Sequence, residues 1–211
     1  MKVGVLGSTR GTTLRGILQA IEQKELVDIK VSCVISSKER AKILETCKDF
    51  NVHGIYLNPE NISKEAYESQ LTAHLKHHKV EYVLLIGWMQ ILSPHFVNEW
   101  KGKLLNVHPS LLPAFAGLMN LQVHRAVLDR GCQVSGATIM FVDHGVDTGP
   151  ILCQGVVPVL PNDSPTTLKT RVQKMEVKCF IHTLQAFQKG QKAQMLGLSS
   201  FMPQLTPFTS W

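Results

Sequence analysis

The chain has 211 residues, of which 44% are hydrophobic and 18% charged, and its formal net charge is +6. This length and composition suit one globular domain with a sizeable core, and they exclude a disordered or fibrous chain. The Lys and Arg residues are scattered rather than grouped, so we expect small anionic molecules, and not nucleic acid, as partners.

Cysteine usage and the missing targeting signals indicate an intracellular protein. The five cysteines are odd in number and have no short C-x-x-C spacing, which argues against a disulfide framework or a zinc site. Residues 1–11 contain too short an apolar run for a signal peptide, and no stretch is long enough to span a membrane. We therefore expect a reduced cytoplasmic protein without a membrane partner, and either a monomer or a homodimer.

Strand-like and helix-like segments alternate through the first half of the chain. The expected strands are 2–7, 29–36, 54–57 and 81–86. Helical periodicity is expected after Thr12, which we take as the N-cap, and over 38–50 and 64–79. This alternation predicts an α/β fold with a single open, mostly parallel sheet, helices on both faces and a Rossmann-like N-terminal half.

A polar loop of small residues joins the first predicted strand to the first predicted helix. Strand, loop and helix in this order present backbone N–H groups and a helix N-terminus to a phosphate, although a plain tight turn has the same pattern. The dinucleotide fingerprint G-x-G-x-x-G is not matched here, because the segment reads Gly7-Ser8-Thr9-Arg10-Gly11.

An apolar loop follows the strand predicted at 81–86. It contains Trp88, Met89, Ile91 and Leu92, and it lies where open α/β sheets bind ligands. Such a loop suits a flat heteroaromatic ring, but it equally suits packing under the next helix. The residues alone leave both interpretations open.

Two polar residues lie at the end of the next predicted strand, which spans residues 103–107. Asn106 and His108 are two positions apart, and Pro109 favours an extended backbone at His108, so both side chains should point to the same face. An amide beside an imidazole suits acyl-type chemistry, because both can donate hydrogen bonds to a developing oxyanion and the imidazole can move a proton. A turn-forming Asn and a structural His are the alternatives.

The C-terminal part supplies a carboxylate for this pair. After a helix at 123–130, two long strands are expected at 133–142 and 150–159, and the loop between them returns Asp147 toward Asn106 and His108. A final helix begins at Ser164 and is closed by Gly190. We therefore predict one domain over residues 1–190 and a C-terminal tail, 191–211, without an assigned function.

These motifs together resemble the folate-dependent formyltransferases. The match rests on Asn106-Val107-His108-Pro109-Ser110-Leu111-Leu112-Pro113, Gly117 and Val146-Asp147-Thr148-Gly149-Pro150-Ile151. Within that family, the branch that formylates glycinamide ribonucleotide in purine synthesis is the most similar. The resemblance implies the formyltransferase fold, a catalytic domain over 1–190, and formyl transfer from 10-formyltetrahydrofolate to a primary amine without a metal.

The resemblance also implies a role for individual residues. The catalytic residues would be Asn106, His108 and Asp147. The phosphoribosyl substrate would bind Arg10, Gly11, Thr12, Thr13, Gln173 and Glu176. The folate would bind Lys64, Met89, Gln90, Ile91, Leu92, Asp143, His144, Gly145 and Val146.

Two alternatives remain beside this assignment. A sister formyltransferase acting on an amino-sugar nucleotide would share the catalytic motif. A nucleotide-binding Rossmann-like protein without transfer activity would share the fold. The first loop also departs from the family pattern, since one of its two usual glycines is missing and Arg10 could add a charged contact there.

Overall fold

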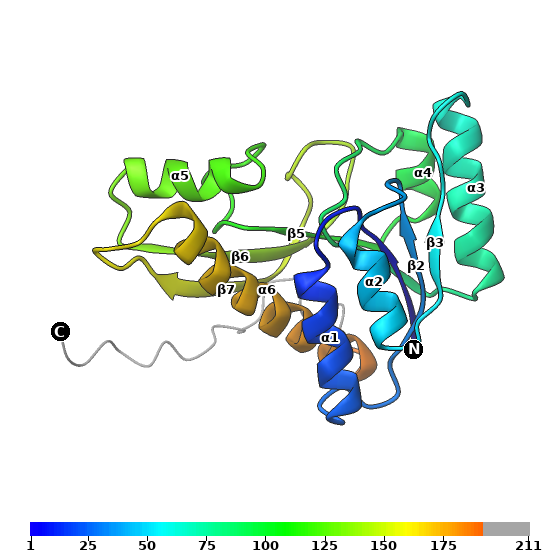
Figure 1. The fold of residues 1–211 in the computed structure, drawn as a ribbon, viewed down its shortest axis with the longest axis horizontal. Helices are drawn as coiled ribbons and strands as arrows, with labels where there is room; N and C mark the ends of the chain where they lie inside the picture. The colour runs from blue at the N-terminus through cyan, green and yellow to red at the C-terminus, as the bar shows by residue number, and fades with distance from the viewer. Residues whose placement is uncertain (192–211) are drawn as a thin grey trace.

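The computed structural model describes residues 1–191, which form one sheet flanked by helices (Figure 1). The elements are β1 (Lys2–Leu6), α1 (Thr12–Glu22), β2 (Lys30–Ser36), α2 (Lys42–Asp49), β3 (Gly54–Tyr56), α3 (Lys64–His77), β4 (Tyr82–Leu85), α4 (Pro94–Glu99), β5 (Leu104–His108), α5 (Leu121–Asp129), β6 (Val134–Phe141), β7 (Ile151–Pro158) and α6 (Pro165–Gln188). From residue 192 onward, the predicted tail lies outside the described residues. None of the described helices is both long and apolar enough to cross a membrane.

The seven strands lie in the order β3-β2-β1-β4-β5-β6-β7. The pairs from β3 to β5 are parallel, whereas β6 runs antiparallel to β5 and to β7. The chain builds outward from β1 in one direction and then, from β4, in the other, so the loops after β1 and β4 meet at the point where ligands bind in such sheets. The predicted open, mostly parallel sheet is confirmed.

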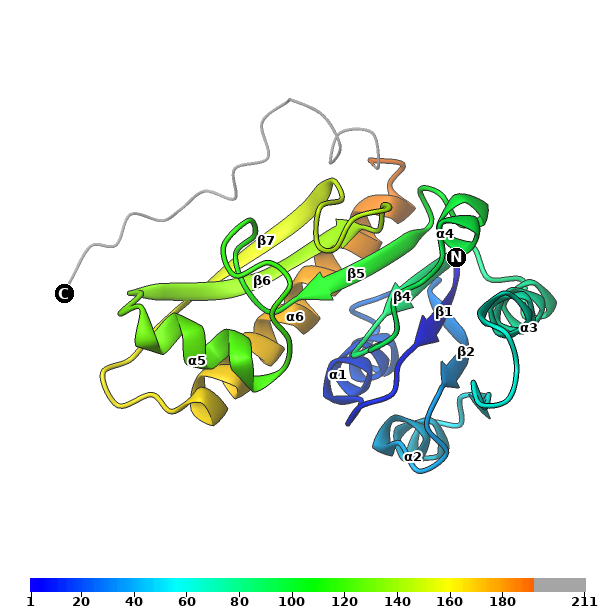
Figure 2. The same cartoon turned by 90° about the horizontal axis from the view of Figure 1, so that it is seen from above.

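Helices cover both faces of the sheet because side chains alternate along each strand. In β1, Val5 belongs to the core beneath α1, α2 and α6, whereas its neighbour Leu6 belongs to the core beneath α3 and α4. Figure 2 shows α1 and α3 on opposite sides of β1. A smaller cluster, which includes Val127 and Val172, packs α5 beside α6. The prediction of helices on both faces is therefore confirmed.

The start of α1 differs from the prediction. Gly11, and not Thr12, is the N-cap residue, and its φ of 73° is left-handed. A side chain at Gly11 would also bring its Cβ within 2.9 Å of Ile43 Cα, so the first loop can pack closely on α2 only because this residue is glycine. The N-cap prediction for Thr12 is wrong because loop packing determines where this helix begins.

Two further boundaries depend on local hydrogen bonds. The helix predicted from residue 38 begins at Lys42, because the Ser36 hydroxyl bonds to both the N–H and the carbonyl of Lys38 and holds a turn there. The six-residue helix α4 was not predicted, since it is too short to show a period. Its start carries Ser93 as the N-cap and Pro94 as the first residue.

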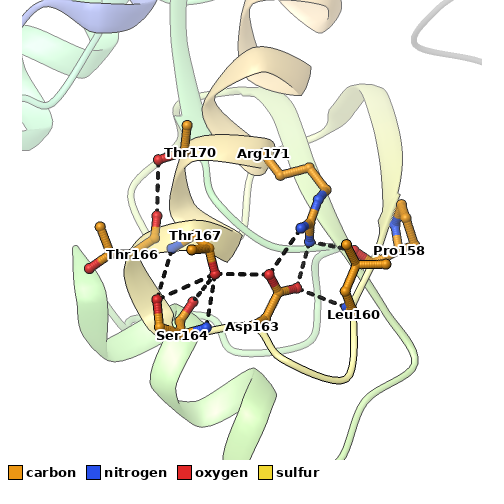
Figure 3. A network of polar contacts seen from close by, with 8 residues as sticks. All are labelled: Pro158, Leu160, Asp163, Ser164, Thr166, Thr167, Thr170 and Arg171. Carbon is orange, nitrogen blue, oxygen red and sulfur yellow. Dashed lines mark hydrogen bonds and ion pairs between the residues drawn. The ribbon is translucent and has the colours of Figure 1, made fainter.

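A network of polar contacts fixes the beginning of α6 (Figure 3). Ser164 is the N-cap, as predicted, and it exchanges hydrogen bonds with Thr167 in a capping box. Asp163 accepts two hydrogen bonds from Arg171, at 2.6 and 2.9 Å, and one from the Leu160 N–H at 2.8 Å. These bonds hold the pKa of the Asp163 carboxyl well below its usual range, the Arg171 contact being the main cause. The network sets the direction in which α6 crosses the sheet.

We predict that Asp163→Ala lowers the free energy of unfolding by about 1–3 kcal/mol, because it leaves Arg171 and the Leu160 N–H without their acceptor. Urea denaturation at pH 7 measures this difference, with Asp129→Ala on the exposed end of α5 as the control. Because the folded-state pKa is lowered, the advantage of the wild-type protein should shrink as the pH falls below about 4. An equal stability of wild type and Asp163→Ala at pH 7 would contradict the anchoring role.

Candidate active site

A cavity of about 1250 Å³ opens at the carboxyl ends of β1, β4 and β5. Its walls come from the loop after β1, the loop after β4, the end of β5, the loop between β6 and β7, and one face of α6. These segments are distant in the sequence. They meet because the order in which the chain adds strands to the sheet reverses between β1 and β4. The cavity is therefore positioned by the topology of the sheet.

Asn106, His108 and Asp147 meet in the wall of this cavity. The His108 Nδ1 atom lies 3.1 Å from Asp147 Oδ2, and the two side chains are only 4% and 9% exposed. The Asn106 amide approaches Asp147 Oδ1 at 3.5 Å. The Gly117 N–H donates to Asp147 Oδ2 at 2.9 Å, from a residue whose φ of 77° suits glycine. The predicted return of Asp147 to this pair is confirmed.

The surroundings of this trio favour the ionised form of Asp147. Burial raises the pKa of the Asp147 carboxyl, but the hydrogen bonds from His108 and Gly117 outweigh it and hold that pKa below its ordinary value. The His108 Nδ1 faces a carboxylate and its Nε2 lies 3.1 Å from the carbonyl oxygen of Phe115. Both partners only accept hydrogen bonds, so both ring nitrogens of His108 are placed beside acceptors.

At one end of the cavity, the first loop meets α6. The Thr13 hydroxyl donates a 2.7 Å hydrogen bond to Glu176 Oε2, which joins residues 163 positions apart in the sequence. The N-terminus of α1 opens there, without a side-chain cap, and Arg10 is exposed at the rim. Backbone N–H groups at a helix start and a nearby guanidinium suit a phosphate.

Glu176 is a carboxyl group with only 8% of its surface exposed. Burial raises its pKa to about 7, and the Thr13 hydrogen bond and the charges of Lys169 and His108 only partly oppose this. An acidic group that titrates near neutrality can both donate and accept hydrogen bonds there. Such a group suits a partner with hydroxyls.

The other end of the cavity is apolar and bounded by two loops. Met89, Ile91 and Val146 line it, and Ile91 and Val146 are 75% and 58% exposed. The loop between β6 and β7 is held by Asp143, whose Oδ1 accepts bonds from the Gly145 N–H at 3.0 Å and from a threonine hydroxyl at 2.7 Å. Exposed apolar side chains beside ordered backbone suit a flat ring with polar edges.

The structure brings nearly all predicted site residues together. The predicted residues that line this one cavity are Arg10, Gly11, Thr12, Thr13, Met89, Gln90, Ile91, Leu92, Asn106, His108, Asp143, His144, Gly145, Val146, Asp147, Gln173 and Glu176. Lys64 instead lines a smaller cavity of about 280 Å³, which shares Gln90 and Ile91 with the main one. A long ligand could reach it from the main cavity.

The sequence analysis did not identify other polar residues that line the cavity. Lys38, Arg40 and Lys42 extend the positive rim beside Arg10, and His124 and Lys169 lie deeper. The position of Lys169 could have been inferred, because it lies four residues before Gln173 and therefore on the same helix face. Within residues 1–191, no group of three or more His, Cys, Asp or Glu side chains is arranged to hold a metal ion.

We predict that Glu176→Gln changes the pH dependence of stability. The wild-type pKa is higher in the folded state, so folding takes up a proton and stability falls as the pH rises from about 4.5 to 7. Gln cannot ionise, so the variant should gain roughly 3 kcal/mol relative to wild type between pH 5 and pH 8, as measured by urea denaturation. If the stability of wild type and of Glu176→Gln changed in parallel with pH, the Glu176 carboxyl would not be kept neutral by burial.

Comparison with known proteins identifies relatives of this site and fold. The phosphoribosylglycinamide formyltransferase of Bacillus subtilis (strain 168) is 30% identical over 201 residues, which cover 94% of this chain and 96% of that protein. The trifunctional purine biosynthetic protein adenosine-3 of Drosophila pseudoobscura pseudoobscura is 39% identical over 191 residues, 90% of this chain. This chain spans only 14% of the length of that trifunctional relative.

Solved structures and the family profile agree with these relatives. The glycinamide ribonucleotide transformylase 1 of Symbiobacterium toebii is similar with a TM-score of 0.84 and 34% identity, over 90% of this chain and 88% of that one. The sequence profile described as formyl transferase matches residues 1–184. The resemblance inferred from the Asn106–Asp147 motifs is thus confirmed, and the chain belongs to the formyl transferase family.

Proposed function

We propose that this chain transfers the formyl group of 10-formyltetrahydrofolate to the primary amine of 5-phosphoribosylglycinamide, giving the N-formyl product in purine synthesis. The observation that carries the proposal is the buried His108–Asp147 pair, at 3.1 Å, between a phosphate-suited end and an apolar end of one cavity. The acceptor would bind on the first loop and α6, and the folate between the two apolar loops. Both molecules are substrates, and the chemistry needs no metal because the donor carbonyl is already an activated amide.

The reaction begins with attack of the acceptor amine on the formyl carbon. The carbonyl oxygen takes the negative charge of a tetrahedral intermediate, and Asn106 and His108 donate hydrogen bonds to it. The His108 Nε2–H, which bonds to the Phe115 carbonyl in this structure, would prefer the oxyanion because a charged acceptor makes the stronger hydrogen bond. Collapse of the intermediate breaks the bond to the folate nitrogen and leaves the formyl group on the amine.

Asp147 supports this step through charge and position. Its carboxylate favours the imidazolium of His108, so a cationic donor faces the developing oxyanion. The carboxylate can also take up the proton lost by the amine, through a water molecule. His108 gives its proton to the departing folate nitrogen, and the proton held by Asp147 then passes to the neutral imidazole across their hydrogen bond, which restores both groups and balances the transfer.

A coupled assay with purified protein tests the reaction itself. Folate release from the 10-formyl donor should require 5-phosphoribosylglycinamide, and mass spectrometry should find the formyl group on the acceptor amine. Release without any acceptor would instead indicate a hydrolase. Transfer to an amino-sugar nucleotide, and not to the glycinamide compound, would support the sister formyltransferase.

We predict that Asp147→Asn lowers kcat by about 10²- to 10⁴-fold, because the imidazolium loses its negative partner while the shape of the site is kept. Binding of the folate, measured by calorimetry, should change little. Retention of near wild-type kcat in a variant with an unchanged Tm would remove Asp147 from the mechanism.

We further predict that Arg10→Ala raises KM for the phosphorylated acceptor by about threefold to tenfold, through loss of an exposed charge contact, and leaves KM for the folate unchanged. The matched control is Arg130→Ala, at an exposed arginine that does not line the cavity. Equal changes in both KM values would mean that the first loop has only a structural role.

A further inference from the structure

Two polar side chains in the cavity wall have no role in the reaction described so far. Lys169 projects from α6 four residues before Gln173 and seven before Glu176, and all three line the cavity. His124 comes from α5, which packs beside α6, and only 2% of its surface is exposed. Val127, three residues after His124, belongs to the same buried cluster as Leu168, the neighbour of Lys169, and the charge of Lys169 acts on both His124 and Glu176.

His124 is a neutral and unpartnered imidazole. Its Nδ1 is buried and has no hydrogen-bond partner within residues 1–191. Burial, together with the positive charges of Lys169 and His108, lowers the pKa of His124 to about 4. A neutral imidazole offers one hydrogen-bond donor and one acceptor, and a buried nitrogen left without a partner destabilises the empty site.

Lys169 supplies the complementary group. It is half-buried, lines the cavity and forms no ion pair with a carboxylate in the part of the chain that the structure describes. In the sequence, Lys169 lies between Thr167 of the capping box and Arg171 of the Asp163–Arg171 pair. These contacts, drawn in Figure 3, hold the first turns of α6, so the backbone that carries the Lys169 side chain is ordered.

The neighbours of this pair indicate what it binds. The charges of His108 and Lys169 both act on His124 and on Glu176. All four residues line one cavity, so the pair can meet a ligand that also contacts the trio and the Thr13–Glu176 end. In the acceptor of the proposed reaction, an amide group lies between the reacting amine and the ribose. An amide has one N–H and one carbonyl, which match one acceptor and one cationic donor.

We infer that Lys169 and His124 recognise the amide of the acceptor, with Lys169 donating to its carbonyl oxygen and a His124 ring nitrogen accepting from its N–H. This assignment rests on the proposed function and adds a determinant of acceptor specificity. It explains why a cation and an unpaired imidazole are placed together beside Gln173 and Glu176. The phosphate and ribose would still be bound by the first loop and Glu176.

Lys169→Met tests the inference by titration calorimetry with two ligands. 5-Phosphoribosylglycinamide carries the amide, whereas ribose 5-phosphate keeps the phosphate and ribose but lacks the amide. We expect the variant to bind the first about tenfold or more weakly and the second as wild type does. Equal weakening of both ligands, or of neither, would overturn the assignment. Lys174→Met, on the exposed face of the same helix, is the matched control and should change neither Kd.

His124 is tested by a pair of variants because it is buried. His124→Asn keeps a hydrogen-bonding group near the Nδ1 position, whereas His124→Leu removes it. We expect Asn to retain most of the affinity for 5-phosphoribosylglycinamide and Leu to lose it, with Tm recorded for both. Equal affinities of the two folded variants would exclude His124 from recognition.

The outcomes separate this inference from the proposed function. If wild-type protein does not formylate 5-phosphoribosylglycinamide, the proposed function fails and the inference fails with it. If wild type turns over normally but Lys169→Met keeps its Kd for that acceptor, only the inference fails. Should both His124 variants be unfolded, the Lys169→Met result with the two ligands still decides.

Discussion

The proposed chemistry depends on one buried contact, the 3.1 Å approach of His108 Nδ1 to Asp147 Oδ2. A carboxylate that is 9% exposed must be paired, and its partners here are an imidazole and the Gly117 N–H. That requirement fixes the path of the loop between β6 and β7, which must return to the end of β5. The antiparallel pairing of β6 with β5, which places Met140 opposite Asn106, makes the return short enough.

The rest of the cavity follows from how α6 crosses the sheet. Its start is fixed by Asp163 and Ser164, and its middle turns bring Glu176 to Thr13 at the first loop. One face of α6 thus carries both Lys169, which we infer binds the amide of the acceptor, and Glu176, which we propose binds its ribose. Because the other walls are loops after β1 and β4, variation there can alter ligand preference without changing the trio.

The sequence predicted the sheet and the trio well because their signals are local. Period-two spacing and Pro109 placed Asn106 and His108 on one face, and Ser164 and Gly190 marked the ends of the last helix. Contacts between distant segments were not predictable. Gly11 replaced Thr12 as N-cap because of close packing on α2, and nothing in the sequence brought His124 near Lys169. The position of Lys64 in an adjoining cavity was not predictable either, because it depends on how α3 packs.

A double-mutant cycle on kcat/KM for formyl transfer tests the central contact most directly. His108→Ala and Asp147→Ala would be measured singly and together, with Tm recorded for each. If the two residues act as one unit, the double variant should be no slower than the slower single variant within about threefold, because the first substitution already removes their joint effect. If the two losses multiply, His108 and Asp147 act independently, and the buried pair is not what drives the transfer.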